Sequence, residues 1–391
     1  MTFKAFKLFF TSVAGSGVLI FGCVVLSLII ANTSLSTGFQ ELLDTQWGWQ
    51  TNSLHLRYPL QLWINDGLMA IFFLMVGLEI KREMVQGELA TPKKALLPII
   101  CAVGGAIVPA LIFALFNNGK PTASGWGIPM ATDIAFALAI IGMLSKRVPT
   151  SLKIFLAALA IVDDLIAILV IAIFYAGNLQ VSYLLYAGAV VLLLVILNRF
   201  KVLGLIYYLI PGVFLWYFIH QSGVHATIAG VIVALFIPAT GVKRSIPSRK
   251  STSPLEKLEH LLETPVNYLI VPLFALANTN ITFQNEMIAG IFSPLGLGII
   301  AGLVVGKPIG ILLVSFLSVK TRICQLPEHA NWKHVAGVGL LAGIGFTMSI
   351  FMAILSFTDL FLIAEAKFFV LLASVISAFL GYFLLRSTSK K

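Results

Sequence analysis

Long apolar runs separated by short polar stretches make up most of this chain. A helix crosses a bilayer in about 20 apolar residues, and runs of this kind lie at about residues 8–31, 59–80, 95–116, 122–144, 153–175, 181–199, 202–219, 223–237, 258–277, 290–317, 334–356 and 365–385. The first run is too long for the apolar part of a signal peptide, so we count it as a span. The pattern predicts an all-α polytopic membrane protein with about 12 transmembrane helices in a single domain, residues 1–391.

Two connections are longer than the others. Residues 45–58, TQWGWQTNSLHLRY, alternate apolar and polar positions on each side of a QTNS turn, which is the period-two pattern of a β-hairpin. Because a two-stranded hairpin is marginally stable alone, we expect it to pair with something, such as a second copy of the chain; an ordinary folded-back outer loop is the alternative. Residues 238–257 carry prolines and basic side chains and predict a cytoplasmic connector after the first eight spans.

The composition agrees with a membrane location. The chain is 59% hydrophobic and 11% charged, with a mean hydropathy of +0.99, whereas soluble domains carry roughly a quarter charged residues. Most of the 26 Lys and Arg residues fall on the side of the predicted topology that holds both termini, and such an excess marks the cytoplasmic side. The net charge of +10 therefore reflects topology, and we expect no nucleic-acid partner.

A small set of ionisable side chains interrupts the apolar runs: Asp66, Glu79, Asp133, Asp163, Asp164 and Lys307. An intramembrane charge costs ~2.5–3.5 kcal/mol on insertion scales, and such residues by default mark ion or proton pathways. A helix rises about 1.5 Å per residue, which places the last four of this set near the middle of their spans. These four groups can therefore meet at one level of the membrane. By contrast, Asp359 and Glu365 are interpreted as exposed loop acids.

The adjacent acids Asp163 and Asp164 lie in the apolar string AIVDDLIAI. Neighbouring helical residues point ~100° apart, so one acid can face a water-filled cavity while the other turns to a neighbouring helix. A purely structural pairing of one acid with Lys307 is the alternative. Neighbouring carboxylates with little water around them raise each other's affinity for protons, and their oxygens suit hard cations such as Na⁺ and Li⁺. The doublet can therefore hold a small cation or protons but not both, which makes exchange of one for the other possible.

Two apolar segments have matching interruptions. GWGIPMATDIAFAL carries glycines and Pro129 before Thr132 and Asp133, and VAGVGLLAGIGFTMSIF carries glycines before Thr347. Interrupted helices in corresponding places of two halves are the best sequence indication of a transport site. Each interruption exposes helix ends of opposite partial charge inside the membrane. Asp133 and Lys307 are the natural counter-charges for them.

Other classes of function lack their sequence signatures. No GxSxG or HExxH string and no GxxxxGK[ST] loop is present, and the cysteines show neither a disulfide framework nor metal-type spacing. We therefore expect a secondary active transporter with no cofactor, driven by an ion gradient and not by ATP; it is not expected to be an enzyme. A cation channel or another ion-coupled secondary transporter is the alternative.

Six strings in order resemble the NhaA family of bacterial Na⁺/H⁺ antiporters: WINDGLMAIFFLMVGLEIKRE (63–83), GWGIPMATDIAFAL (125–138), AIVDDLIAI (160–168), SGVHATIAG (222–230), GKPIGI (306–311) and GIGFTMSIF (343–351). The resemblance runs from about residue 8 to 385. This family is itself one of the examples behind the rule on interrupted helices used above. The resemblance implies inverted repeats whose two discontinuous helices cross at the midplane. It also implies a homodimer formed through the outer hairpin, in the bacterial inner membrane.

The resemblance also implies roles for individual residues. Asp163 and Asp164 would be the cation and proton site, with Thr132 and Asp133 beside them, and Lys307 would balance helix ends, pair with the first aspartate or carry a proton. Asp66 would line the outer funnel. A cytoplasmic pH-responsive cluster would comprise Glu79, Glu83, Glu259 and His260. The chain departs from the family at Glu263, where histidine is frequent. The expected activity is electrogenic Na⁺(Li⁺)/H⁺ antiport, with two protons per Na⁺, serving sodium and pH homeostasis.

Overall fold

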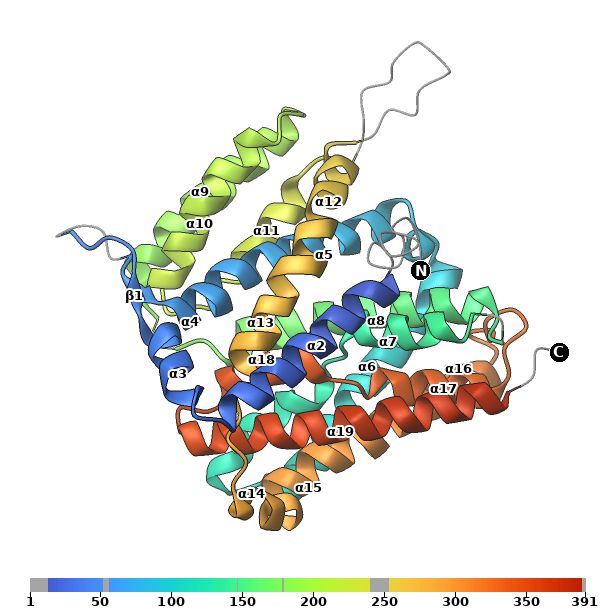
Figure 1. The fold of residues 1–391 in the computed structure, drawn as a ribbon. Coiled ribbons are helices and arrows are strands. Elements are labelled where there is room, and N and C mark those ends of the chain that lie inside the picture. Colours follow the sequence, from blue (N-terminus) through green and yellow to red (C-terminus); the bar gives the residue numbers. More distant parts are fainter. Residues whose placement is uncertain (1–12, 52–55, 146, 178, 240–252, 389–391) are drawn as a thin grey trace, which may run out of the picture. The chain divides into compact units, whose positions relative to one another are not determined.

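The computed structural model describes residues 13–51, 56–145, 147–177, 179–239 and 253–388, which are helical over most of their length (Figure 1). The chain forms two compact units, each assembled from separate stretches of sequence. Unit 1 comprises residues 1–33, 88–167 and 278–391. Unit 2 comprises residues 34–87 and 168–277.

Unit 1 contains the two segments that the sequence predicts to be interrupted. Its helices are α2 (Val13–Ala31), η2 (Glu88–Ala90), α6 (Pro92–Asn117), η3 (Pro121–Met130), α7 (Ile134–Met143), α8 (Thr150–Phe174, up to Ala167), α14 (Asn285–Ala289), η5 (Gly290–Phe292), α15 (Pro294–Ala301), η6 (Gly302–Gly306), α16 (Lys307–Lys320), α17 (Trp332–Ala342), α18 (Phe346–Ser356) and α19 (Leu360–Ser387). The longest of them, α19, lies along α17 and also packs against α15 and α18 (Figure 1).

Small residues bring α6 and α16 of unit 1 into close contact. A Cβ atom added to Gly310 would lie 2.2 Å from the backbone oxygen of Gly104, closer than any side chain fits. Lipid chains are as apolar as leucine, so helices in a bilayer associate through close packing and not through the hydrophobic effect. The two glycines therefore hold α16, and with it Lys307 at its first position, against α6.

Unit 2 consists of helices and one short strand pair. Its elements are α3 (Ser36–Asp44), β1 (Gln46–Trp47), β2 (Tyr58–Pro59), α4 (Leu60–Leu62), η1 (Trp63–Leu68), α5 (Met69–Val85), α9 (Val181–Arg199), α10 (Ile206–Gln221), α11 (Ile228–Phe236), α12 (Pro254–Pro265), η4 (Val266–Ile270) and α13 (Val271–Asn278). Helix α11 packs on α5, α9 and α10. A Cβ atom on Gly230 of α11 would lie 2.1 Å from the oxygen of Ala70, so this contact also depends on glycine.

The spans agree with a polytopic membrane protein. Among the described residues, eight helices are long and apolar enough to cross a membrane, or up to ten if each bent pair counts as one span. Helices α10, of 16 residues, and α11, of 9 residues, are shorter than the ~20 residues that a straight crossing needs. The total of about 12 spans, the start of the span at 8–31 and the inverted repeats stay predictions.

The loop at residues 45–58 contains a strand pair. Gln46 lies opposite Pro59 and Trp47 opposite Tyr58 in an antiparallel register. The turn expected at QTNS extends beyond the described residues, so the complete hairpin stays a prediction. Most of the connector at residues 238–257 also lies outside the described part of the chain. Where the description resumes, Ser253 and Glu256 form a reciprocal capping box at the start of α12.

The interpretation of Glu365 as an exposed loop acid is wrong. Helix α19 begins at Leu360 and already includes Glu365, whose exposed fraction is 8%. Lys367, two residues later, is buried as well. The physical reason is that Asp359 caps α19 by accepting a hydrogen bond from the amide of Phe361 at 2.8 Å, which starts the helix earlier than the apolar run does.

Candidate ion-binding site

The two interrupted segments of unit 1 are hydrogen-bonded to each other at their breaks. Helix η3 ends at Met130 and α7 begins at Ile134, whereas α17 ends at Ala342 and α18 begins at Phe346 with a bend of 45°. The amide of Asp133 donates to the oxygen of Ile344 at 2.6 Å, and the hydroxyl of Thr132 donates to the oxygen of Ala342 at 2.8 Å. The breaks therefore expose four helix ends in one small region.

Asp133 lies at two of these ends, both of them N-termini. One carboxylate oxygen, Oδ1, accepts from the amide of Phe136 at 3.1 Å in the first turn of α7. The other, Oδ2, accepts from the amide of Thr347 at 3.1 Å and from its hydroxyl at 2.5 Å in the first turn of α18. A helix N-terminus carries a partial positive charge. A single buried carboxylate thus satisfies the amides of two helices that are distant in sequence.

Lys307 has its ammonium group at the C-terminus of a helix, an end that carries a partial negative charge. Its Nζ donates to the backbone oxygen of Met130, the last residue of η3, and lies 2.7 Å from Oδ2 of Asp163. The exposed fractions of the Lys307 and Asp163 side chains are 0% and 1%. Removing two charges from water costs several kcal/mol per ion, which only close geometry and further hydrogen bonds offset. The ammonium group has both here.

Oxygen atoms surround this ion pair. Thr132 lies within hydrogen-bonding reach of Asp163 through its hydroxyl and its amide. Asp164 follows on α8, is 2% exposed, and is close enough to interact electrostatically with Lys307. The structure therefore brings Thr132, Asp133, Asp163 and Lys307 together, with Asp164 next to them. Carboxylate, hydroxyl and carbonyl oxygens are the ligands of hard cations.

The residues predicted for the cytoplasmic cluster lie in unit 2. Arg82 connects two of them: its Nη2 lies 3.1 Å from Glu83, and its Nη1 forms an ion pair with buried Glu259. Glu79 interacts electrostatically with Glu259 and Arg82. His260 is exposed and its Nδ1 lies 3.7 Å from Glu263, at the position where the chain departs from the family pattern. Sequence reasoning missed Arg82, although its place directly before Glu83 was a usable signal.

Asp66 also lies in unit 2, where it has a partner that sequence reasoning missed. Its Oδ2 lies 3.3 Å from Nδ1 of His220. His220 is in the last turn of α10, and an ionisable residue at the end of an apolar run was the available signal. His225 lies nearby in sequence, and its ring Nε2 is 2.7 Å from the oxygen of Tyr175.

Comparison with known proteins identifies the family of the chain. The family described as Na⁺/H⁺ antiporter 1 matches residues 7–385. The chain is 57% identical over 388 residues to Na⁺/H⁺ antiporter NhaA 2 of Flavobacterium johnsoniae, covering 99% of this chain and 93% of that protein. It is 48% identical to NhaA of Bordetella parapertussis, covering 97% of this chain and 95% of that protein. It is 46% identical to NhaA of Escherichia coli, covering 97% of each. On this full-length similarity the chain belongs to the Na⁺/H⁺ antiporter 1 family, a family of transporters and not of enzymes.

Proposed function

We propose that this protein is an electrogenic antiporter that extrudes Na⁺, or Li⁺, from the cytoplasm in exchange for protons, with two protons per cation. The observation that carries the proposal is the buried pair of Lys307 and Asp163 beside Asp164 and Thr132, at the point where two broken helices meet. Broken helices with ionisable groups between them are the sites at which secondary transporters bind ions. The curated relatives carry the name Na⁺/H⁺ antiporter.

The proposed cation site consists of Asp163 and Asp164, with oxygen ligands from Thr132 and Asp133. A cation that binds Asp163 competes with the ammonium group of Lys307 for the same carboxylate oxygen. Binding therefore requires the contact between Lys307 and Asp163 to open. If Asp163 is ionised and paired with Lys307, the protons that leave come from Lys307 and Asp164; if Asp163 is protonated, they come from Asp163 and Asp164. Both routes release two protons in total, one of which comes from Asp164. Asp133 would continue to balance exposed helix ends through Thr347, and Lys307 would do so through Met130 as long as it keeps its proton.

Competition at one site is sufficient for coupled exchange. A site that holds either a cation or protons, and that seldom changes sides when empty, moves the two in opposite directions. Two charges then enter for each one that leaves. The membrane potential therefore contributes ~2.3 kcal/mol per 100 mV for the net charge moved, which makes the cycle electrogenic.

The groups of unit 2 are proposed to regulate this exchange. Glu79, Glu83, Glu259 and His260 would respond to cytoplasmic pH, and Arg82 supports this because two of the acids share its guanidinium group. Asp66 would line the outer funnel. The roles are in keeping with sodium and pH homeostasis.

The protein is proposed to be a homodimer in the bacterial inner membrane with both termini in the cytoplasm. The excess of basic residues on one side of the predicted topology supports this orientation. Trp47 and Trp49, with exposed fractions of 60% and 79%, support a contact with a second copy at the strand pair. Large exposed aromatic side chains are enriched at protein interfaces.

One experiment separates antiport from channel activity. The purified protein is reconstituted into proteoliposomes, an outward Na⁺ gradient is applied, and proton uptake is followed with and without an imposed potential. Antiport predicts proton movement against its own gradient that responds to the potential. Na⁺ current without coupled proton movement would identify a channel and overturn the proposal.

A further inference from the structure

The pair formed by His220 and Asp66 joins two elements of unit 2 that are distant in sequence. Asp66 lies in η1, a π-helical stretch at the start of a long span, and His220 lies in the last turn of α10. Nδ1 of His220 is 3.3 Å from Oδ2 of Asp66, and the two side chains are 16% and 17% exposed. π-Helical turns are rare in proteins, and those that occur are often found at functional sites. This one places the carboxylate of Asp66 next to a histidine.

Aromatic rings fix the position of both partners. The His220 ring stacks on Trp216 with centroids 5.6 Å apart and planes 10° apart, and meets the edge of Tyr58 at 4.9 Å. Trp216 in turn stacks on Trp63 at 5.8 Å, and its Nε1 donates to the backbone oxygen of Asp66 at 3.1 Å. The imidazole therefore has little freedom to leave the carboxylate.

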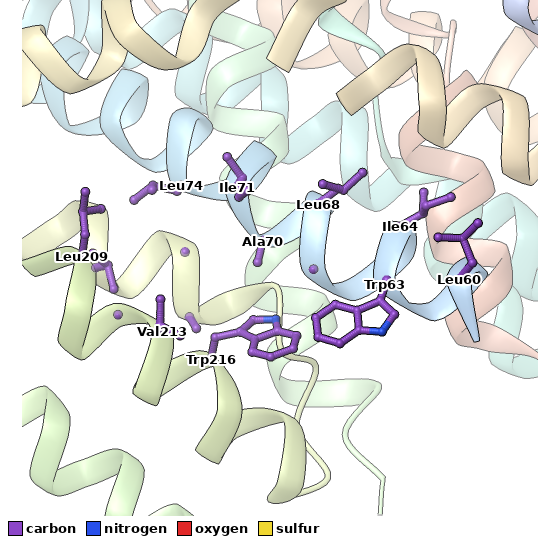
Figure 2. A pocket seen from close by; sticks show the side chains of 15 residues that line it. Leu60, Trp63, Ile64, Leu68, Ala70, Ile71, Leu74, Leu209, Val213 and Trp216 are labelled. Carbon is purple, nitrogen blue, oxygen red and sulfur yellow. The ribbon is translucent and has the colours of Figure 1, made fainter. Parts of the chain in front are cut away.

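An apolar pocket lies behind these rings. It has a volume of about 550 Å³ and is lined by residues of α4, η1, α5, α10 and α11. Figure 2 shows Trp63 and Trp216 side by side among these residues. An interaction between charges strengthens as the surroundings become less polar. Both tryptophans line the pocket, and Trp216 also contacts the His220 ring and the backbone of Asp66, so it shields one side of the pair from water.

Asp66 and His220 both lie far from the end of their helical spans at which Lys and Arg residues gather. Asp66 precedes Lys81 by about 20 Å of helix at 1.5 Å per residue, and α10 begins soon after Arg199 and Lys201 and ends at Gln221. The pair therefore lies at the end of each helical span that is opposite to its basic residues. On the orientation proposed above, this end faces the outside of the cell.

We propose that His220 is a proton-controlled partner of Asp66 that sets the negative charge of this end of unit 2, and thereby the apparent cation affinity of the transporter. The inference rests on the proposed antiport function. When His220 is protonated, it pairs with the carboxylate and cancels its charge. When His220 loses its proton, Asp66 attracts cations without opposition. Histidine is suited to this role because its charge changes in the physiological pH range.

Other titratable groups of the described chain surround the pair, but they do not form an ion pair with Asp66. Tyr58 accepts a hydrogen bond from Gln221 at 3.0 Å, and burial raises the pKa of its phenol above the ordinary value of 10.0. Tyr183 and Tyr217 interact electrostatically with Tyr58. His225 interacts electrostatically with Asp66 and His220, and its Nε2 contacts the backbone oxygen of Tyr175. Among these described groups, His220 is the ionisable side chain in ion-pair contact with Asp66.

The test compares His220→Gln, Asp66→Asn and the double variant of the full-length protein. Na⁺ is titrated in proteoliposomes at about pH 6 and about pH 8.5, on either side of the range in which histidine titrates. Relative to the unmodified protein, His220→Gln should improve the apparent Na⁺ affinity about three- to fivefold at the lower pH and leave it unchanged at the higher pH. The gain should vanish in the Asp66→Asn background. His329→Asn, at an exposed histidine with φ of 60° that asparagine tolerates, is the matched control.

A second readout does not depend on transport. In detergent, His220→Gln should lower the melting temperature more at about pH 6 than at about pH 8.5, because the attraction between His220 and Asp66 exists only while His220 is protonated. This difference between the two pH values should disappear in the Asp66→Asn background. An equal effect of His220→Gln at both pH values, in affinity and in melting temperature, would show a merely structural role and overturn the inference. Absence of Na⁺-coupled exchange in the unmodified protein would instead contradict the proposed function, and the melting comparison would still decide whether the pair responds to protons.

Discussion

Lys307 and Asp163 form a buried ion pair, with Nζ 2.7 Å from Oδ2, while the same ammonium group donates to the carbonyl of Met130. The lysine therefore contacts both a carboxylate on α8 and the carbonyl end of η3. These contacts are compatible with both structural roles that the family resemblance implies for Lys307, which are to balance a helix end and to pair with the first aspartate of the doublet. They also make Lys307 sensitive to any ligand that binds Asp163.

The first prediction concerns stability. Lys307→Ala should lower the free energy of unfolding by about 3–5 kcal/mol, because it leaves Asp163 buried without its partner. The measurement is the melting temperature of the purified protein in detergent. Lys320→Ala, at the exposed end of the same helix, is the control and should have little effect. An unchanged melting temperature in Lys307→Ala would show that the lysine offsets neither the charge of Asp163 nor the partial charge at the end of η3.

The second prediction concerns the proton site. Asp164→Asn should abolish exchange while the protein stays folded and inserted, since an amide keeps the shape of the carboxyl but exchanges no proton. Na⁺-induced pH change in everted vesicles is the measurement, with Asp44→Asn at an exposed position as the control. Robust exchange by vesicles that carry Asp164→Asn would contradict the assignment of the site.

The third prediction concerns pH. Where both carriers are mostly protonated, the apparent Na⁺ affinity should weaken by up to about a hundredfold for each unit fall in pH, since each displaced proton contributes about a factor of ten. The affinity therefore falls toward acid and levels off toward alkali. The measurement is the Na⁺ concentration at half-maximal exchange over a series of pH values.

The slope by itself does not identify the second carrier, but a variant does. If Lys307 carries one of the two protons, exchange by Lys307→Ala becomes electroneutral and its limiting slope falls to about tenfold per pH unit. If both protons belong to Asp163 and Asp164, the variant keeps its response to an imposed potential. Lack of any such response in the unmodified protein would rule out the two-proton scheme.

The fourth prediction concerns the contact between the broken helices. Thr347→Val removes the hydroxyl that donates to buried Asp133 and should lower the free energy of unfolding by about 1.5–3 kcal/mol, the range for hydrogen bonds to charged groups. Thr347→Ser keeps the donor and should retain most of the stability. Equal melting temperatures for the Val and Ser variants would mean that the hydroxyl contributes nothing.

The sequence by itself determined the membrane class and the chemistry available to the site. Apolar length is a local property, so the polytopic membrane class and the acids that interrupt the apolar runs could be read directly. The breaks were also predictable, because glycine and proline near Asp133 and before Thr347 act on their own backbone. The doublet of Asp163 and Asp164 required no partner to be recognised.

Only the tertiary structure decided which charges meet. Asp133 contacts Thr347, and Lys307 contacts Asp163 and Met130, across separations of 214, 144 and 177 residues. No local pattern specifies such pairs, since they depend on how helices pack. The same reason explains why the pairing of Arg82 with Glu259 and of His220 with Asp66 was missed. Glu365 was misplaced because a capping hydrogen bond, and not the apolar run, sets the start of its helix.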